Sequence, residues 1–263
     1  MKALLQCFGF TAALVSLAAV AQAGVVIEQE QRDLSGEVVM GRTVYYLEPG
    51  KVRIETSNEV SEMVTIFIAA RRVVWVIDRS EGTYYELKPA EVERMRQRME
   101  EARRRMEAEL AKLPPQQREL IEKMMEQQQA PGPSAVSVRK TGSGEKLGEF
   151  VCSRYEILRN GQRYGEVWAA SLDQLQIEPE EFETFRALAR FFEPLGAGAP
   201  ASAALLSAGE QIEGFPVRML IYEDGRPLRE ERVVRVERRS LDVSHFTLPP
   251  GLQKAQWGQQ VQL

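Results

Sequence analysis

Residues 64–77, Val-Thr-Ile-Phe-Ile-Ala-Ala-Arg-Arg-Val-Val-Trp-Val-Ile, contain two nearly continuous apolar runs joined by a short connection. Each run is five residues long and rich in β-branched side chains, which is typical of a strand. A strand that is apolar at almost every position is covered on both of its faces. Residues 64–68 and 73–77 are therefore predicted to be neighbouring strands inside a sheet.

The segments on either side of these runs also predict strands. Residues 51–55 alternate strictly between charged and apolar side chains, as a half-buried strand does. Residues 38–47 and 83–87 are rich in β-branched and aromatic side chains. The Pro49-Gly50 pair is typical of a type II turn. The region before residue 88 is thus predicted to be an antiparallel meander with short loops.

Residues 89–129 have a different composition and predict a charged helical insertion. Pro89 suits the first helical position, and residues 90–113 contain no Gly and no Pro. Their apolar side chains recur at heptad-like spacing, at Val92, Met95, Met99, Ala102, Met106 and Leu113. Pro114-Pro115 ends this helix, and a shorter helix is predicted over 116–128.

The rest of the chain returns to strands, with one more amphipathic helix. Hairpins are predicted for 150–158 with 162–170 and for 215–222 with 228–238. Residues 140–146 suggest a connection, and residues 196–209 suggest a loop or a weak helix. A helix is predicted to begin at Pro179, with acidic side chains in its first turn and Phe182, Phe185, Leu188, Ala189 and Phe192 on one face.

The fold class that follows is α+β: a curved antiparallel sheet, or half-barrel, with helices covering its concave face. Residues 24–254 are expected to form a single domain that includes the helical insertion 89–129. Residues 255–263 are Gln-rich and are expected to be a disordered tail.

The first residues predict export to the periplasm. Lys2 precedes an apolar stretch, and Ala21-Gln22-Ala23 matches the site of a signal peptidase, so we expect residues 1–23 to be a signal peptide cleaved after Ala23. No later run is apolar enough to span a membrane, so no transmembrane segment is expected after cleavage. Cys152 is then the only cysteine, which leaves no internal disulfide.

Several stretches together resemble a known superfamily. Residues 46–55, 74–78 and 83–87, with the Cys152-x-x-Tyr155 strand and the Phe246-x-Leu248-Pro249-x-Gly251 ending, resemble the LolA/LolB-like half-barrels of the periplasmic lipoprotein carriers. The similarity is greatest to a secreted bacterial branch known only as a domain of unknown function. The resemblance implies that an acyl chain or another apolar ligand lies between the sheet and its helices.

Composition argues against most other classes of function. The chain has 263 residues, one His and two Cys, too few for most zinc, haem or iron–sulfur sites. His245 has no obvious catalytic partner, and neighbouring carboxylates lie on solvated helices, so no enzyme activity, metal or cofactor is expected. The net charge of −4 gives no attraction to nucleic acid.

We therefore expect a non-enzymatic periplasmic protein that holds a lipid, a lipoprotein acyl chain or another apolar ligand between its sheet and a helical lid. The expected wall of that site is apolar and consists of Trp75, Met95, Met99, Met106, Trp168, Phe182, Phe185 and Phe192. The alternative is a structural or interaction protein of the cell envelope. In that alternative the charged helical pair docks a partner protein, and no cavity is open.

Overall fold

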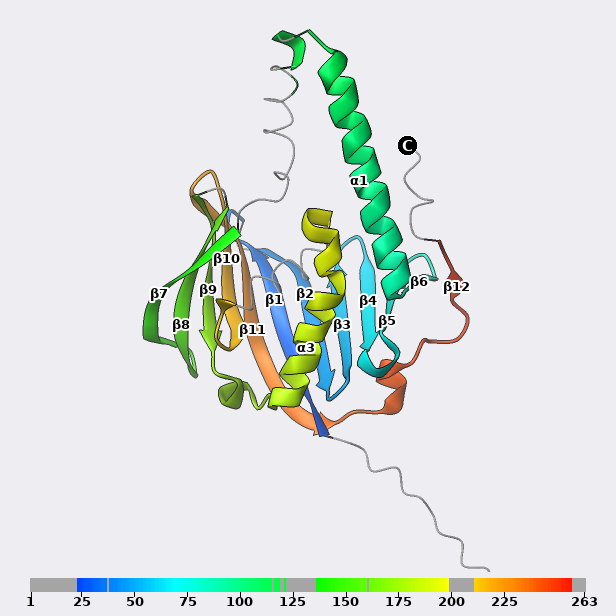
Figure 1. The fold of residues 1–263 in the computed structure, drawn as a ribbon. Helices are drawn as coiled ribbons and strands as arrows, with labels where there is room; N and C mark the ends of the chain where they lie inside the picture. Colours follow the sequence, from blue (N-terminus) through cyan, green and yellow to red (C-terminus); the bar gives the residue numbers. More distant parts are fainter. Residues whose placement is uncertain are drawn as a thin grey trace, which may run out of the picture.

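A single sheet of twelve strands forms most of the molecule (Figure 1). The computed structural model describes residues 23–36, 38–114, 116–118, 121, 136–159, 161–198 and 211–256. The strands follow the spatial order β12-β6-β5-β4-β3-β2-β1-β11-β10-β9-β8-β7. Neighbours are antiparallel except β12 and β6, which are parallel and make the sheet mixed.

The bounds of the elements are as follows. The strands are β1 (Ala23–Asp33), β2 (Val38–Glu48), β3 (Lys51–Asn58), β4 (Glu62–Ile68), β5 (Val73–Asp78), β6 (Thr83–Leu87), β7 (Val136–Leu147), β8 (Phe150–Arg159), β9 (Gln162–Ala170), β10 (Phe215–Glu223), β11 (Arg226–Ser240) and β12 (Gln253–Lys254). The α-helices are α1 (Pro89–Lys112) and α3 (Pro179–Phe192). Short 3₁₀ helices are η1 (Ala69–Arg71), η2 (Leu172–Leu175), η3 (Glu193–Gly198) and η5 (Val243–Phe246).

The predicted meander is confirmed as β2 to β6, which pair in consecutive order. Gly50 adopts a φ of 79° in the turn between β2 and β3, a conformation that glycine tolerates without steric cost. The two apolar runs are β4 and β5, and Ile66 lies opposite Trp75 in their ladder. The two predicted hairpins are also confirmed, as β8 with β9 and β10 with β11.

Strands β4 and β5 are covered on both faces, as their composition predicted. Phe67 and Val74 belong to the core cluster that includes the apolar face of α3. Ile66 and Trp75 point to the other face, where Leu248 from the segment after β11 packs against their cluster. The chain's C-terminal segment therefore covers the face that α3 leaves open.

Strand β1 lies between the two halves of the sheet. It pairs with β2 on one side and with β11 on the other, so that Ile27 lies opposite both Tyr45 and Val236. Val25 and Ile27 are 0% exposed. Strands β1 and β11, the first and last long strands of the described chain, thus pair with each other in the middle of the sheet.

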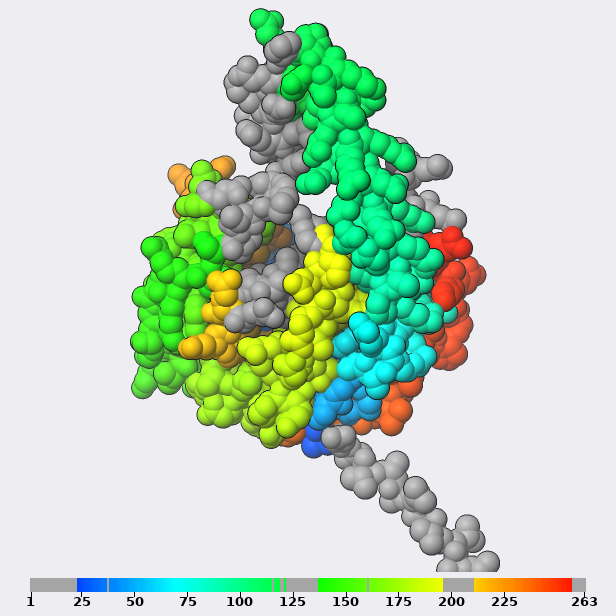
Figure 2. Space-filling model, viewed as in Figure 1, coloured from blue at the N-terminus to red at the C-terminus, as the bar shows by residue number. Residues whose placement is uncertain are grey.

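The predicted fold class, an α+β half-barrel of the LolA/LolB type with helices covering its concave face, is wrong. The sheet is open and mixed, β7 and β12 are its edges, and α3 is the described α-helix that packs along one face, against β2 and β3 (Figures 1 and 2). Helix α1 starts beside β6 and projects beyond the sheet. The physical reason is composition: Val92 is the one buried side chain of α1, whereas α3 buries a complete apolar face.

Residues 140–146 are also not a connection, because they belong to edge strand β7. An edge strand needs a backbone partner on one side only, so it does not require an apolar alternation. Other predictions fall outside the described residues. The signal peptide lies there up to residue 22, as do most of the helix over 116–128, residues 199–209 and residues 257–263.

Candidate ligand-binding site

The eight residues predicted to form an apolar wall do not line one cavity in the structure. The two tryptophans lie on strands, in different parts of the sheet. Trp75 belongs to the cluster beneath the C-terminal segment, and its indole N–H donates to Glu86 at 3.1 Å. Trp168 is part of the main core, and its indole N–H donates to Glu145 at 2.8 Å. The next residue, Val167, points away from Trp168 and lines a cavity on the face of the sheet that carries α3.

The methionines of α1 lie along a helix that leaves the body of the protein. Met95 is half-buried near the base of α1, where it packs against the core. Met99 is 42% exposed and Met106 is 38% exposed. Ion pairs such as Arg96–Glu93 and Arg103–Glu107 follow the same helix at spacings of three and four residues.

Replacing Met99 by glutamate should therefore have little effect on folding. The side chain is exposed, and substitutions of this kind usually change the free energy of unfolding by about 0.5 kcal/mol or less. Urea denaturation of the variant should give the wild-type midpoint. A loss of several kcal/mol would show instead that α1 packs against another part of the chain.

The three phenylalanines of α3 that were predicted to form the wall are buried, and Phe185 among them lines a cavity. Phe182, Phe185 and Phe192 all belong to the main core cluster. Phe185 also lines a cavity of about 320 Å³ on the face of the sheet that carries α3, and Phe182 and Phe192 do not line it. Small-molecule sites span roughly 300–1,000 Å³, so this volume is at the lower end of that range.

Both apolar and polar side chains line this cavity, which we call the α3-face cavity. They come from β1, β2, β3, β8, β9, β10, β11, α3 and the segment before β10. The apolar members are Tyr45, Ile54, Ile157, Val167, Phe185, Ile212, Phe215, Pro216 and Met219. The polar members are Gln29, Gln31, Thr43, Thr56 and Glu231.

Three aromatic rings meet in the wall of the α3-face cavity. The Tyr45 ring contacts Phe185 and Phe215 edge-on, with ring centroids 5.8 and 5.9 Å apart. The centroids of Phe185 and Phe215 are 5.7 Å apart. These distances lie within the range that favours aromatic pairs. Helix α3 therefore joins the sheet through rings that also shape the cavity.

Polar groups lie in the same wall, on β1 and β11. The side-chain amide of Gln29 donates to the carbonyl of Pro216 at 3.2 Å, and that of Gln31 donates to Oε1 of Glu231 at 3.2 Å. Burial raises the pKa of Glu231, although the hydrogen bond from Gln31 and the charge of Arg229 oppose the rise. Burial, with the nearby Glu231 charge, also raises the pKa of Tyr45.

Replacing Glu231 by glutamine should stabilise the ligand-free protein at neutral pH. Because the pKa of Glu231 is raised on folding, the carboxylate costs stability as the pH rises above its unfolded value, about 4.3. Glutamine removes that cost and can still accept the hydrogen bond from Gln31. Each kcal/mol gained should raise Tm by about 2–4 °C.

Thermal melts of both proteins between pH 4 and pH 8 would measure this effect. The two curves should converge at the acid end and separate as the pH rises. A variant that is less stable than the wild type at neutral pH would contradict this account of the carboxyl.

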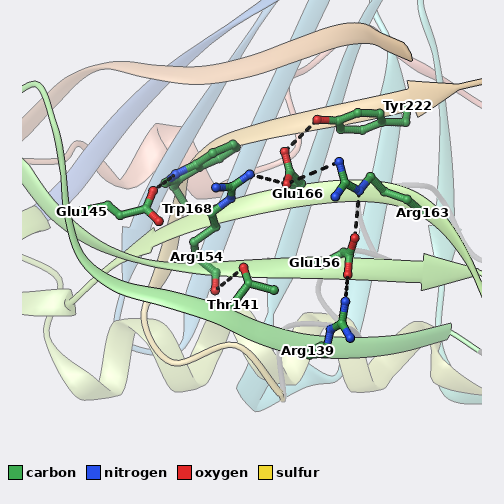
Figure 3. A network of polar contacts seen from close by, with 9 residues as sticks. All are labelled: Arg139, Thr141, Glu145, Arg154, Glu156, Arg163, Glu166, Trp168 and Tyr222. Carbon is green, nitrogen blue, oxygen red and sulfur yellow. Dashed lines mark hydrogen bonds and ion pairs between the residues drawn. The ribbon is translucent and has the colours of Figure 1, made fainter. Parts of the chain in front are cut away.

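A second polar cluster lies on β7 to β10 and is structural (Figure 3). The Glu156 carboxylate accepts from Arg163 at 2.8 Å and from Arg139 at 2.5 Å, and these hydrogen bonds lower its pKa. Glu166 accepts from Arg154 at 2.5 Å and from the Tyr222 hydroxyl at 2.7 Å. Each carboxylate is 8% exposed or less and has cationic partners. The cluster therefore offers no unpaired acid or base.

The sequence does contain a signal for the polar part of the cavity. In β1, Val25 and Ile27 are core residues, and Gln29 and Gln31 continue the same row at a spacing of two. Two amides in line with core positions mark a place where the core contains polar groups. Glu231 lies among charged residues on β11, and only the register against Gln31 shows that it faces the cavity.

Two features are absent from the described part of the chain. Among these residues, no three His, Cys, Asp or Glu side chains are grouped so that they could hold a metal ion. None of the described helices is long and apolar enough to cross a membrane.

In the described part of the chain, fold and cavity define a protein built on a single sheet, with helix α3 packed on that sheet and a ligand-sized cavity beside the helix. Residues 116–252 match the model of a protein family described as a domain of unknown function, DUF4412. Since the match covers just over half of the chain, the protein belongs to this family. No curated protein matches the chain.

The fold is distantly similar to that of solved structures. One is an uncharacterized conserved protein from Thermus thermophilus, which is 11% identical with a TM-score of 0.43 and aligns over 90% of this chain and 91% of its own. Another is PNGF-II, which is 10% identical with a TM-score of 0.42 over 89% of this chain and 30% of its own. Both TM-scores are below 0.5, so neither similarity bears on function.

Proposed function

We propose that the protein binds a small, mainly apolar ligand in the α3-face cavity and holds it without chemical change. The observation that supports this proposal is the combination of an aromatic wall, formed by Tyr45, Phe185 and Phe215, with a few polar groups on β1 and β11. Concave sites lined mostly by apolar side chains, with a small number of polar groups, are typical of small-molecule binding.

The proposed site differs in place from the one that the sequence suggested. The ligand lies against α3 and the middle of the sheet, and the methionines of α1 take no part. Among the lining residues, Glu231 is the only carboxylate and no His or Cys is present. That set lacks the paired acid and base or the activated nucleophile that catalysis commonly uses, which favours binding over chemistry.

A neutral apolar dye tests this proposal. Phenylnaphthylamine should bind the purified protein with a rise in fluorescence, and native mass spectrometry of freshly purified protein should show a bound small molecule. Thr43 lines the cavity from β2, so replacing it by tryptophan should fill the space and abolish dye binding.

The matched control is a tryptophan at Val39, which is on the same strand, is 49% exposed and does not line the cavity. This variant should bind the dye as the wild type does. Wild-type protein that binds no dye and carries no small molecule would overturn the proposed function. Equal binding by the wild type and the Thr43 variant would place the dye elsewhere and overturn the assignment to this cavity.

Export to the periplasm is part of the same proposal. Strand β1 begins at Ala23, so cleavage after that residue would leave the strand intact from Gly24 onward. Gly24 is buried against the carbonyl of Leu47, and an added Cβ would lie 2.5 Å from that oxygen. Because Ala21-Gln22-Ala23 matches a signal peptidase site, the N-terminal sequence of protein secreted from the native host should begin at Gly24, and a retained Met1 would count against export.

The alternative is an envelope interaction protein, and one observation favours it. Helix α1 extends from the sheet with a single buried side chain and a surface of alternating charges. Such a helix could dock a partner. Under this alternative, removal of the exposed part of α1 abolishes partner capture, while the Thr43→Trp variant has no effect on it.

A further inference from the structure

Three side-chain oxygens in the polar part of the α3-face cavity have room for a donor: the amide oxygens of Gln29 and Gln31 and Oε2 of Glu231. One N–H of each glutamine amide is already used, by Pro216 for Gln29 and by Glu231 for Gln31. Among the described residues, no donor contacts either amide oxygen or Oε2 of Glu231. A ligand that donates hydrogen bonds would satisfy these oxygens, whereas a ligand that only accepts would leave them unpaired.

The charge in this wall is negative. Glu231 is the only carboxylate that lines the cavity, and no Lys, Arg or His lines it. Arg229 acts electrostatically on Glu231 from two residues away on β11, but it does not line the cavity and it also acts on Asp33. An anionic ligand such as a fatty acid would meet an acid there, whereas a cation would meet its counter-ion.

The aromatic part of the wall also suits a cation attached to an apolar body. Tyr45, Phe185 and Phe215 give the cavity three rings in mutual contact. Ring faces attract ammonium groups, and ring edges and faces pack against another aromatic group. An acid beside a group of aromatic rings is a combination that recognises amines.

Building on the proposed function, we propose that the ligand is an aromatic or aliphatic amine. Its apolar body packs against Tyr45, Phe185 and Phe215, and its ammonium group donates hydrogen bonds to Glu231 and the two glutamine oxygens. The cavity of about 320 Å³ limits the ligand to a small molecule rather than a complete diacyl lipid.

Three compounds of matched shape test the ligand class by calorimetry: phenylbutylamine, phenylbutanol and phenylbutanoate. Because hydrogen bonds to charged groups are the strong ones, the Kd of the amine should be lower than that of the alcohol by a factor of about ten or more. The carboxylate should bind most weakly. Replacing Glu231 by glutamine should bring the amine to within about twofold of the alcohol.

Glu237→Gln is the matched control, because Glu237 is on the same strand, is 40% exposed and does not line the cavity. It should keep the wild-type preference for the amine. A thermal melt of each variant shows whether it is folded.

The outcomes separate the two proposals. If the alcohol binds as tightly as the amine, or if Glu231→Gln retains the preference, the amine class is wrong while apolar binding stands. If neither the three compounds nor phenylnaphthylamine binds, both the amine class and the proposed function are wrong.

Discussion

Replacing Phe215 by alanine should lower the free energy of unfolding by about 3–5 kcal/mol, the usual cost of removing a buried phenylalanine. Phe215 is 2% exposed and contacts both Tyr45 on β2 and Phe185 on α3. It also borders the α3-face cavity. Few side chains are therefore placed to move into the space that the missing ring leaves, and that space stays empty. The loss is large against a total stability of about 5–15 kcal/mol for a typical domain.

Urea denaturation would measure this loss, with Val39→Ala as the control because Val39 is 49% exposed. The control should shift the free energy of unfolding by about 0.5 kcal/mol or less. A Phe215 variant within about 1 kcal/mol of the wild type would mean that α3 is not attached to the sheet through these rings.

Replacing Arg238 by methionine should also be costly, because it removes the cation from a buried carboxylate. Glu181 in the first turn of α3 is 0% exposed, and it accepts from Arg238 of β11 at 3.1 Å and from the backbone N–H of Glu178 at 2.8 Å. Breaking a buried ion pair by removing one partner typically costs about 3–5 kcal/mol. Since Arg238 is itself 28% exposed, we expect a loss near the lower end of that range.

A double variant provides the control for this prediction. Combining Arg238→Met with Glu181→Gln removes both charges and keeps an acceptor for the N–H of Glu178, so much of the lost stability should return. Arg235→Met removes an arginine that is 59% exposed and pairs with Glu28 and Glu237 at the surface, so it should change little. A double variant no more stable than Arg238→Met would show that the arginine acts through packing rather than charge.

The positions of the predicted wall residues show where sequence patterns stop being informative. Trp75 and Trp168 are large and apolar, and the composition of their strands indicates burial, which is confirmed. The direction in which each points depends on which face of the sheet carries α3, and no local pattern contains that information. The methionines of α1 fit the spacing of an amphipathic helix, yet the helix extends past the surface that it was expected to cover.

The cavity was missed for a related reason. Its polar wall consists of Gln29 and Gln31 from β1, with Glu231 from β11, which are about 200 residues apart in the chain. A row of alternating side chains can be read within one strand, but the partner across the ladder is set by the register of two distant strands.

Short-range chemistry determined much of the secondary structure. The meander, both hairpins and helix α3 follow from alternation, from turn residues such as Pro49-Gly50 and from the 3.6-residue period, which all act within a few residues. Edge strand β7 escaped these rules because it pairs on one side only.

Tertiary structure alone decided the assembly of the sheet and its site. It joined β1 to β11, placed the C-terminal segment over the face opposite α3 and left α1 beyond the sheet. It also brought Glu231 beside the rings of Tyr45 and Phe215. The physical reason is that contacts between distant segments depend on which combination of apolar faces buries the most surface, a property of the whole chain rather than of any stretch of it.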